Sequence, residues 1–194
     1  VADLPDWRLL IPNQPQQLSG LRFKALTIPH DASETVAFRI ETMEGPIGFA
    51  TDIGEMTPVL VDQFRDCRLL VIESNHATDL LRVSPYAASV RTRIGSTTGH
   101  LSNESLARFI RNDLGPAVRC IVLAHLSRVN NVPEIAELTC RQALADSGRI
   151  DVQVIVATQD RVAPTVDLGL WVHSTSAVSD QAQAVLPFDM VPNS

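Results

Sequence analysis

The sequence predicts an α/β fold built around a mixed β-sheet. Two short runs, RLLVI at 68–72 and RCIVLA at 119–124, are continuously apolar, which is typical of strands buried inside an α/β sheet. Segments with apolar residues at helical spacing lie between and after these runs. Buried strands that alternate with helices indicate the α/β class.

The first third of the chain is expected to contain mainly strands. Residues 1–20 are rich in Pro, Gln and Asn, and we expect an irregular lead-in there. Strands are expected at 21–28, 35–40 and 45–51, the last of them after a Gly-Pro turn. Thr57-Pro58 then predicts the start of a short helix.

Helices are expected in the middle of the chain. A helical stretch leads to Arg93 with a break at Ser84-Pro85, and Ser102 is a candidate cap for the next helix. Pro133 fits the first turn of a further helix, which ends near Gly148.

The C-terminal part is expected to add two strands and a tail. The strands are predicted at 151–157 and 165–172, where apolar residues alternate. Residues 174–194 are rich in Ser, Gln, Ala and Pro, which predicts a flexible tail. Residues 21–173 are therefore expected to be the folded part of the chain.

The charge balance excludes one class of nucleic-acid protein. The 194 residues carry 16 basic and 22 acidic side chains, a net charge of -6, so the chain does not coat nucleic acid through its overall charge. A nuclease stays possible, because a local basic patch is sufficient to bind a nucleic-acid substrate. Between Asp79 and Glu104 the chain has Arg82, Arg91 and Arg93 and no acidic residue. The alternative is a solvated helix face.

Cysteine usage and hydropathy predict a cytoplasmic protein. Cys67, Cys120 and Cys140 are odd in number, show no CxxC spacing and lie in apolar or helical sequence, so we expect buried free thiols in a reducing compartment. No apolar run approaches the roughly 18–20 residues of a membrane span. The first twenty residues do not resemble a secretory signal.

Ionisable side chains follow four of the predicted strands. His30-Asp31, Asp52, Glu73 and His125 each come directly after an apolar run. In α/β folds, ligands and catalytic groups gather beyond the strand ends. A lone histidine there is usually structural. Two imidazoles and two carboxylates together predict a metal site of the kind that zinc and its relatives occupy.

Longer motifs carry a family resemblance. The segments PHDASETVAFRIE, GPIGFATDIG, LLVIESNH, TTGHLSNESLARFI and CIVLAHLSRVNNVPE resemble the metallo-β-lactamase-fold hydrolases, in particular the YycJ-like branch related to ribonuclease Z. The likeness runs from about Leu21 to Leu170, and the GHLSN and AHLSxxNNxPE runs are its most specific parts. It implies an αββα sandwich of two similar halves, of which this chain supplies mainly the C-terminal one.

The resemblance also implies a site. Members of the family hold two metal ions, Zn²⁺ or alternatively Mn²⁺, through an HxHxDH loop, a further His, a bridging Asp and a final His. The last three correspond to His30, Asp52 and His125. Glu73 of ESNH corresponds to a carboxylate that orients His100 of GHLSN, which protonates the leaving oxygen. The alternative for His100 is that it merely packs beside a helix cap at Ser102.

Three further side chains are candidates for substrate binding. His76 follows the ESN run as a candidate substrate contact, and Arg91 and Arg93 belong to the basic patch.

One motif of the family is not in this sequence. The five histidines, at positions 30, 76, 100, 125 and 173, do not form HxHxDH. We therefore expect an N-terminal half, or another chain, to supply that loop, and we expect the 194-residue chain to be inactive alone. Its inner sheet face would then be an exposed apolar surface, so a free monomer is not expected.

The leading hypothesis is a part of a metal-dependent hydrolase of phosphodiesters, in particular a nuclease with a nucleic-acid substrate. A hydrolase of small esters or cyclic phosphodiesters is the alternative within the fold. A non-catalytic scaffold that has lost its metal is the alternative from another class. An HxHxDH motif upstream of this segment would favour the two hydrolase hypotheses over the scaffold. Strongly salt-dependent substrate binding would favour the nuclease over the hydrolase of small substrates.

Overall fold

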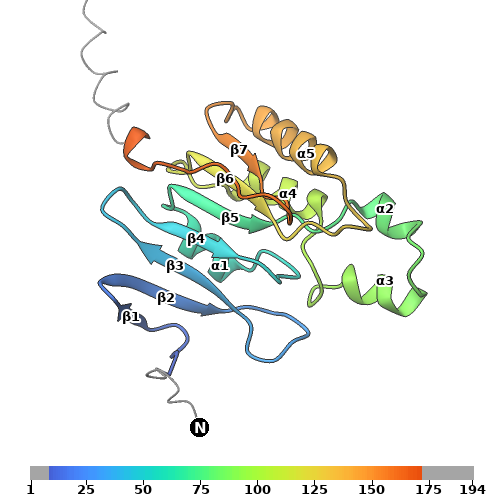
Figure 1. Ribbon diagram of the computed structural model, residues 1–194, viewed down its shortest axis with the longest axis horizontal. Helices are drawn as coiled ribbons and strands as arrows, with labels where there is room; N and C mark the ends of the chain where they lie inside the picture. Colours follow the sequence, from blue (N-terminus) through green and yellow to red (C-terminus); the bar gives the residue numbers. More distant parts are fainter. Residues whose placement is uncertain (1–8, 172–194) are drawn as a thin grey trace, which may run out of the picture.

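A mixed sheet forms the centre of the computed structural model, which describes residues 9–171 (Figure 1). Within these residues the sheet has seven strands, and their order in the sheet follows the chain. The strands are β1 (Pro15–Leu18), β2 (Leu21–Thr27), β3 (Val36–Glu41), β4 (Ile47–Ala50), β5 (Leu69–Glu73), β6 (Cys120–Ala124) and β7 (Gln153–Val156). Strands β1 to β4 pair antiparallel, and β4 to β7 pair parallel. The predicted mixed sheet is confirmed.

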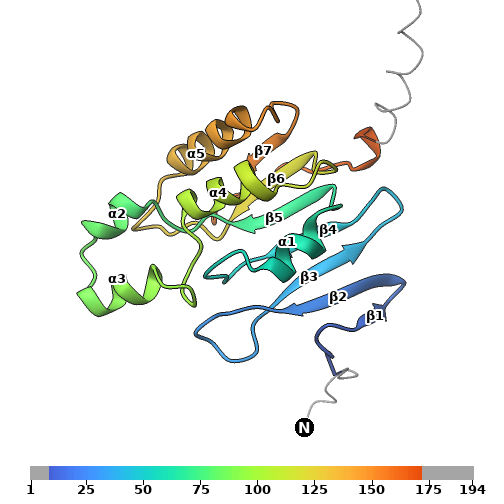
Figure 2. The same ribbon diagram turned by 180° about the vertical axis from the view of Figure 1, so that it is seen from behind.

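Helices cover one face of this sheet. The helices among the described residues are α1 (Pro58–Phe64), α2 (Thr78–Arg82), α3 (Ala88–Ile94), α4 (Asn103–Asp113) and α5 (Pro133–Asp146). Figure 2 shows α1, α4 and α5 against the sheet, whereas α2 and α3 lie beyond the strand ends. The predicted helix starts are confirmed, since Thr57 Oγ1 accepts a hydrogen bond from the Leu60 N–H and Ser102 Oγ from the Ser105 N–H.

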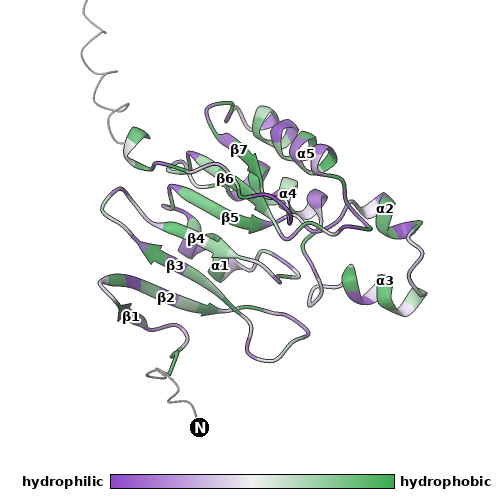
Figure 3. Ribbon diagram, in the orientation of Figure 1, coloured by the Kyte–Doolittle hydropathy of each residue, from purple (hydrophilic) through white to green (hydrophobic). Residues whose placement is uncertain are grey.

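The main core lies between the sheet and these helices. Leu70 and Ile72 of β5 and Ile121 and Leu123 of β6 are fully buried there. They meet Phe64 of α1 and apolar residues of α4 and α5. The buried α5 residues are Ala136, Cys140, Ala143 and Leu144. Figure 3 shows the hydrophobic colouring of β4, β5 and β6 along most of their length. The three cysteines are buried and free, as predicted.

The second face of the sheet is only partly covered. Over β5 to β7, Leu69, Val122 and Ile155 pack against the segment 163–171, which includes Leu168 and Trp171. Over β1 to β4 the same face leaves large apolar side chains in solvent. We call this region the open face: Leu18, Leu21 and Phe49 are exposed by 49%, 46% and 39%.

Two predicted segments differ from the structure. Residues 15–18, predicted as irregular, form β1, because Ser19 and Gly20 both have positive φ and make a tight hairpin turn that pairs 15–18 with β2. The predicted strand at 165–172 is wrong over its described part: residues 165–167 are irregular and Gly169–Trp171 are helical. Val166 and Leu168 alternate because they face the sheet, not because they pair at its edge.

Some predictions fall outside the described residues. The tail at 174–194 is one of them. Within the described part of the chain, no helix has the length and apolar character that crossing a membrane requires.

Candidate metal centre

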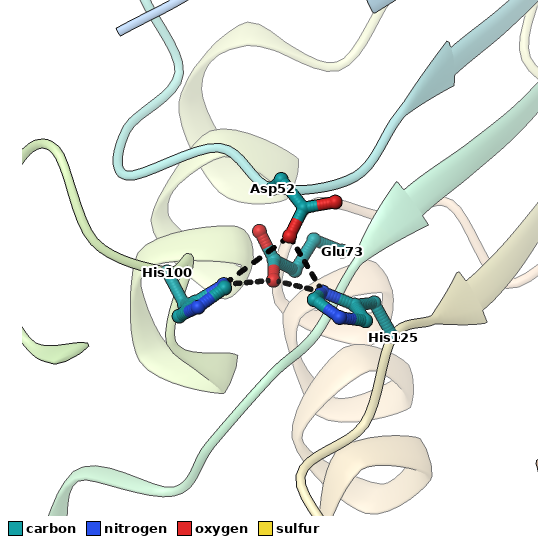
Figure 4. A group of neighbouring side chains, drawn as sticks. All are labelled: Asp52, Glu73, His100 and His125. Atoms are coloured by element: carbon teal, nitrogen blue, oxygen red, sulfur yellow. Dashed lines mark hydrogen bonds and ion pairs between the residues drawn. The ribbon is translucent and has the colours of Figure 1, made fainter. Parts of the chain in front are cut away.

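Strand ends bring four ionisable residues together at one edge of the sheet. Asp52 follows β4, Glu73 ends β5, and His125 follows β6, while His100 comes from the loop before α4 (Figure 4). Each of the four residues offers one potential ligand atom, and these four atoms all lie within 4.8 Å of one another. The carboxyl ends of parallel strands meet at the same edge, so residues far apart in sequence converge there.

Glu73 is the buried centre of this group. Its side chain is fully buried, and its Oε1 accepts hydrogen bonds from His100 Nδ1 at 2.8 Å and from His125 Nδ1 at 2.7 Å. Its Oε2 accepts the backbone N–H of Ile53 at 2.7 Å. Burial disfavours the charged carboxylate, but the hydrogen bonds from both imidazoles outweigh burial and hold the Glu73 pKa below its ordinary value.

The Glu73–His100 contact is the pair that the sequence predicts, whereas the Glu73–His125 contact was missed. The hydrogen bond to Glu73 raises the pKa of His125 above its ordinary value. Because an ionised carboxylate only accepts hydrogen bonds, it fixes the proton of both imidazoles on Nδ1. The Nε2 atoms are thereby left free to bind a metal or to hold a proton.

His30 has the same arrangement with a different acceptor. Its Nδ1 lies 3.0 Å from the carbonyl oxygen of Gly99, and its Nε2 lies 3.9 Å from Asp52 Oδ1. Only glycine fits at position 99, since a Cβ there would lie 2.1 Å from the Arg93 carbonyl oxygen. The glycine of the GHLSN motif therefore permits the loop that orients His30.

Asp52 lies between the histidines. Its Oδ1 is 3.6 Å from His125 Nδ1 and 4.0 Å from His100 Nδ1. Asp52 and His125 both adopt the left-handed backbone conformation, with φ of 55° and 56°. Such strain in residues other than glycine concentrates at functional sites.

The donor set fits a zinc-like ion. His30, Asp52 and His125 offer two imidazoles and a carboxylate, which are ligands that Zn²⁺ takes. Metal-binding histidines in proteins donate their second ring N–H to a carboxylate or a carbonyl oxygen. The Glu73 carboxylate accepts such a hydrogen bond from His125, and the Gly99 carbonyl oxygen accepts one from His30.

A buried network of amides joins the loops that carry these residues. Asn103 and Asn131 exchange two side-chain hydrogen bonds of 2.9 and 3.0 Å, and Ser74 Oγ donates to Asn103 Oδ1 at 2.7 Å. Asn75 Nδ2 donates to the His125 carbonyl oxygen at 2.9 Å. Asn103 and Asn131 belong to the GHLSN and NNxPE runs. The network thus fixes the loops after β5 and β6 and the start of α4 relative to one another.

The three predicted substrate contacts take three different positions. His76 is 2% exposed, burial lowers its pKa, and it faces a second hollow beside Thr78 and Glu104. Arg91 does not line the main cavity above the metal-site residues, and it donates to the carbonyl oxygens of Ser84 and Tyr86. Arg93 lines the main cavity and forms an ion pair with Asp31.

A cavity of about 680 Å³ opens above the cluster. His30, Asp52, His100 and His125 form part of its wall. Tyr86 and Arg128 also line it, and sequence reasoning missed both. Arg128 follows the AHLS run by one residue, which was the available signal.

Comparisons with known proteins agree with this geometry. The model of the beta-lactamase superfamily domain matches residues 3–126. The chain is 29% identical over 128 residues to exodeoxyribonuclease YycJ of Bacillus anthracis, a match that covers 66% of this chain and 48% of that protein. It is 30% identical over 144 residues to exodeoxyribonuclease WalJ of Streptococcus pneumoniae, covering 73% and 54%. The chain thus spans about half the length of the curated relatives it matches.

Solved structures support the same fold. The metallo-beta-lactamase fold protein YhfI of Bacillus subtilis superposes with a TM-score of 0.56 at 17% identity, over 76% of this chain and 50% of YhfI. Yeast PDE1 superposes with a TM-score of 0.51 at 12% identity, over 77% of this chain and 47% of PDE1. With the family model matching well over half of its residues, the chain belongs to the beta-lactamase superfamily and has a metallo-β-lactamase-type α/β fold.

Proposed function

We propose that this chain is part of a metal-dependent hydrolase that cleaves phosphodiesters in nucleic acid. The observation that carries the proposal is the buried Glu73 carboxylate, which orients His100 and His125 beside Asp52 at the floor of a cavity. The two exodeoxyribonuclease names among the relatives support a nuclease. The buried free thiols support a reducing compartment such as the cytoplasm.

His30, Asp52 and His125 are the proposed ligands of the metal centre. Zn²⁺ suits this mixture of imidazole and carboxylate, and Mn²⁺ is the alternative. Two bound ions would polarise a phosphoryl oxygen and activate a water molecule. Asp52 lies between the histidines, as a carboxylate shared by two ions would.

His100 is the proposed general acid. Its Nδ1–H is held by Glu73, which leaves Nε2 to carry the proton that the leaving oxygen needs. Glu73 keeps the imidazole in one tautomer and one orientation. Because Glu73 also holds His125, it acts on the proton donor and on the metal ligand together.

An N-terminal half is the proposed partner of this chain. The chain spans about half of its curated relatives, and its sequence has no HxHxDH loop. The open face, formed by Leu18, Leu21 and Phe49, is an apolar surface that a second sheet could cover. The chain alone would then lack the remaining metal ligands and would be inactive.

Turnover of the complete protein tests the proposal. His100→Ala in this chain, combined with the half that supplies HxHxDH, should lower phosphodiester hydrolysis by roughly 10²–10⁴-fold and leave the metal content unchanged. Arg141→Gln, at an exposed residue of α5 that pairs with Glu137 and does not line the cavity, is the control and should leave turnover unchanged. Loss of metal on His100→Ala would make His100 a ligand and would remove the proposed acid.

A further inference from the structure

The geometry points to a groove for one polynucleotide strand that crosses the metal centre, with Arg93 and Arg128 on its two sides and Tyr86 as a stacking surface for a base. This inference rests on the proposed function and names its substrate class. It selects a strand over a small cyclic phosphodiester. Arg128 and Tyr86 are new members of the site.

Two ion pairs hold the arginines beside the strand ends. Arg93 of α3 pairs with Asp31, which follows β2 and the metal-ligand candidate His30. Arg128 follows β6 and donates to Asp160, which follows β7, at 3.0 Å. The strands β2, β4, β5, β6 and β7 all end at the same side of the sheet, since β2 runs in the direction of β4.

The two arginines can contact different phosphates of one strand. Asp31 Oδ1 lies 3.4 Å from His30 Nε2, so the Arg93 pair adjoins the metal centre, whereas Asp160 follows β7, the last strand of the sheet. Arg93 and Arg128 line the same cavity as His100 and His125. A phosphate bound at the metal centre would therefore lie beside Arg93, and a further phosphate of the same strand would reach Arg128.

Both guanidinium groups are available to a ligand. The Arg93 and Arg128 side chains are 67% and 64% exposed. The Asp160 side chain is 82% exposed, so its ion pair with Arg128 is weak and a phosphate can replace the carboxylate. Asp31 is 26% exposed, and the remaining N–H groups of the exposed Arg93 guanidinium are open to a phosphate. In the absence of a strand, each carboxylate keeps its arginine extended over the cavity.

Tyr86 gives the groove an aromatic wall. Its side chain is 37% exposed and lines the cavity. The Arg91 guanidinium donates to the Tyr86 carbonyl oxygen at 2.7 Å and to that of Ser84 at 3.2 Å, which fixes the loop. Arg91 thus supports the aromatic residue and does not contact phosphate itself. A base that stacks on Tyr86 must be free of its duplex partner, so the ligand is a single strand.

Binding of a labelled oligonucleotide to the full chain tests the groove. The probe is a fluorescein-labelled single-stranded oligodeoxynucleotide, followed by anisotropy in EDTA so that no cleavage occurs, at several salt concentrations. Arg128→Gln should weaken binding and reduce the slope of log K against log salt by about 0.7, the contribution of one phosphate contact on a single strand. Arg141→Gln is the matched control, since Arg141 is an exposed arginine of α5 that pairs with Glu137 away from the cavity. It should leave the slope unchanged.

A second pair of variants tests the stacking. Tyr86→Leu should weaken binding by about 5- to 150-fold, the loss that removal of one base–aromatic contact causes, and Tyr86→Phe should restore it. A blunt duplex of the same sequence should bind more weakly than the single strand. If an oligoribonucleotide binds as tightly as the oligodeoxynucleotide, the result would support a groove that does not distinguish ribose from deoxyribose.

Three outcomes would overturn the groove: no binding of the strand at low salt, equal slopes for Arg128→Gln and Arg141→Gln, or a duplex that binds as well as the strand. The proposed function fails separately. If the chain takes up no Zn²⁺ through Asp52 and His125, the metal centre is wrong. If it takes up Zn²⁺ but the arginine and tyrosine variants bind the strand as the unaltered chain does, only the groove is wrong.

Discussion

At Glu73, two opposing physical effects act on one carboxylate. Burial removes water from the charged group, and hydrogen bonds from His100 and His125 replace that water. Burial is the largest single effect on Glu73, but the hydrogen bonds from His100, His125 and the Ile53 N–H and the charge interaction with His100 together outweigh it, so the Glu73 pKa is lowered. The hydrogen bond to Glu73 raises the His125 pKa. A buried charge of this kind is stable only while both partners stay in place.

These shifts predict how the stability of the metal-free chain depends on pH. His125 has a raised pKa, so its contribution to the free energy of unfolding is complete below about pH 6.5 and is lost as the pH rises through the raised value. Glu73 has a lowered pKa, so its contribution is present above about pH 4.3 and is lost as the pH falls through the lowered value. NMR titration in EDTA should place the His125 pKa above that of a model histidine.

Glu73→Gln provides the comparison for that titration. A neutral amide cannot favour the imidazolium as a carboxylate does, so the His125 pKa should fall in this variant. An unchanged His125 pKa in Glu73→Gln would show that the carboxylate does not set it.

The sequence predicted most of the residues that form the site, but not all of the contacts between them. His30, Asp52, Glu73 and His125 were predicted because each follows an apolar run, and the sheet does bring them to one edge. The Glu73–His125 hydrogen bond depends on the left-handed backbone of His125, which side-chain patterns do not reveal. Tyr86 was missed because it reaches the cavity only through the path of the loop between α2 and α3.

At the level of elements, the loops after β5 and β6 and the start of α4 act as one unit. Asn131 donates to Asn103 and to the carbonyl oxygens of Ser74 and Asn75. The neighbouring Asn130 is also fully buried, but its side-chain atoms have no hydrogen-bond partner among the described residues. Substitutions at these two adjacent asparagines therefore distinguish the effect of burial on stability from the effect of side-chain hydrogen bonds.

Asn131→Ala should lower the free energy of unfolding by about 2–4 kcal/mol. The substitution leaves the buried Asn103 amide and the partly buried Val132 N–H without their acceptor. An unsatisfied buried group costs about 1–3 kcal/mol, and a partly buried one costs less. Asn130→Ala removes a similar volume and no hydrogen bond of the side chain, so its effect should be about 1 kcal/mol or less. Urea denaturation measures both. Equal effects would mean that the network adds nothing beyond packing.

Propensity and periodicity predicted the regular elements but not the role of every segment. The buried strands β5 and β6 and the caps at Thr57 and Ser102 follow from local sequence. The segment 165–171 alternates as a strand does, yet it lies across the sheet face, because packing on a face requires the same period of two as pairing at an edge. Local sequence cannot distinguish these two cases.

At the scale of the whole molecule, the sheet has two unequal faces. The helical face buries Leu70, Ile72 and Leu123 completely. The open face leaves Leu18, Leu21 and Phe49 in contact with water. An exposed apolar region on one side of a sheet is typical of a surface that meets another unit.

The chain should therefore not behave as a free monomer at micromolar concentration. Sedimentation velocity should detect dimers or larger species, and co-expression with the half that supplies HxHxDH should convert them into a stable complex. Phe49→Lys, which puts a charge on the open face, should shift the chain towards the monomer. Val162→Lys, at a fully exposed position outside the open face, is the control. A cooperative, thermally stable 21.2 kDa monomer would contradict the half-domain account.

The most direct test of the account is a zinc titration of the 194-residue chain, followed by calorimetry and checked by elemental analysis after gel filtration. We expect weak binding of well under two Zn²⁺ per chain, lost in Asp52→Asn and in His125→Ala and retained in Arg141→Gln, whose exposed side chain pairs with Glu137 away from the cavity. Glu73→Gln should weaken the binding by roughly 10–100-fold, as the loss of a partner behind a metal-binding histidine does. Two tightly held ions, or binding that survives Asp52→Asn and His125→Ala, would contradict the assignment of the site.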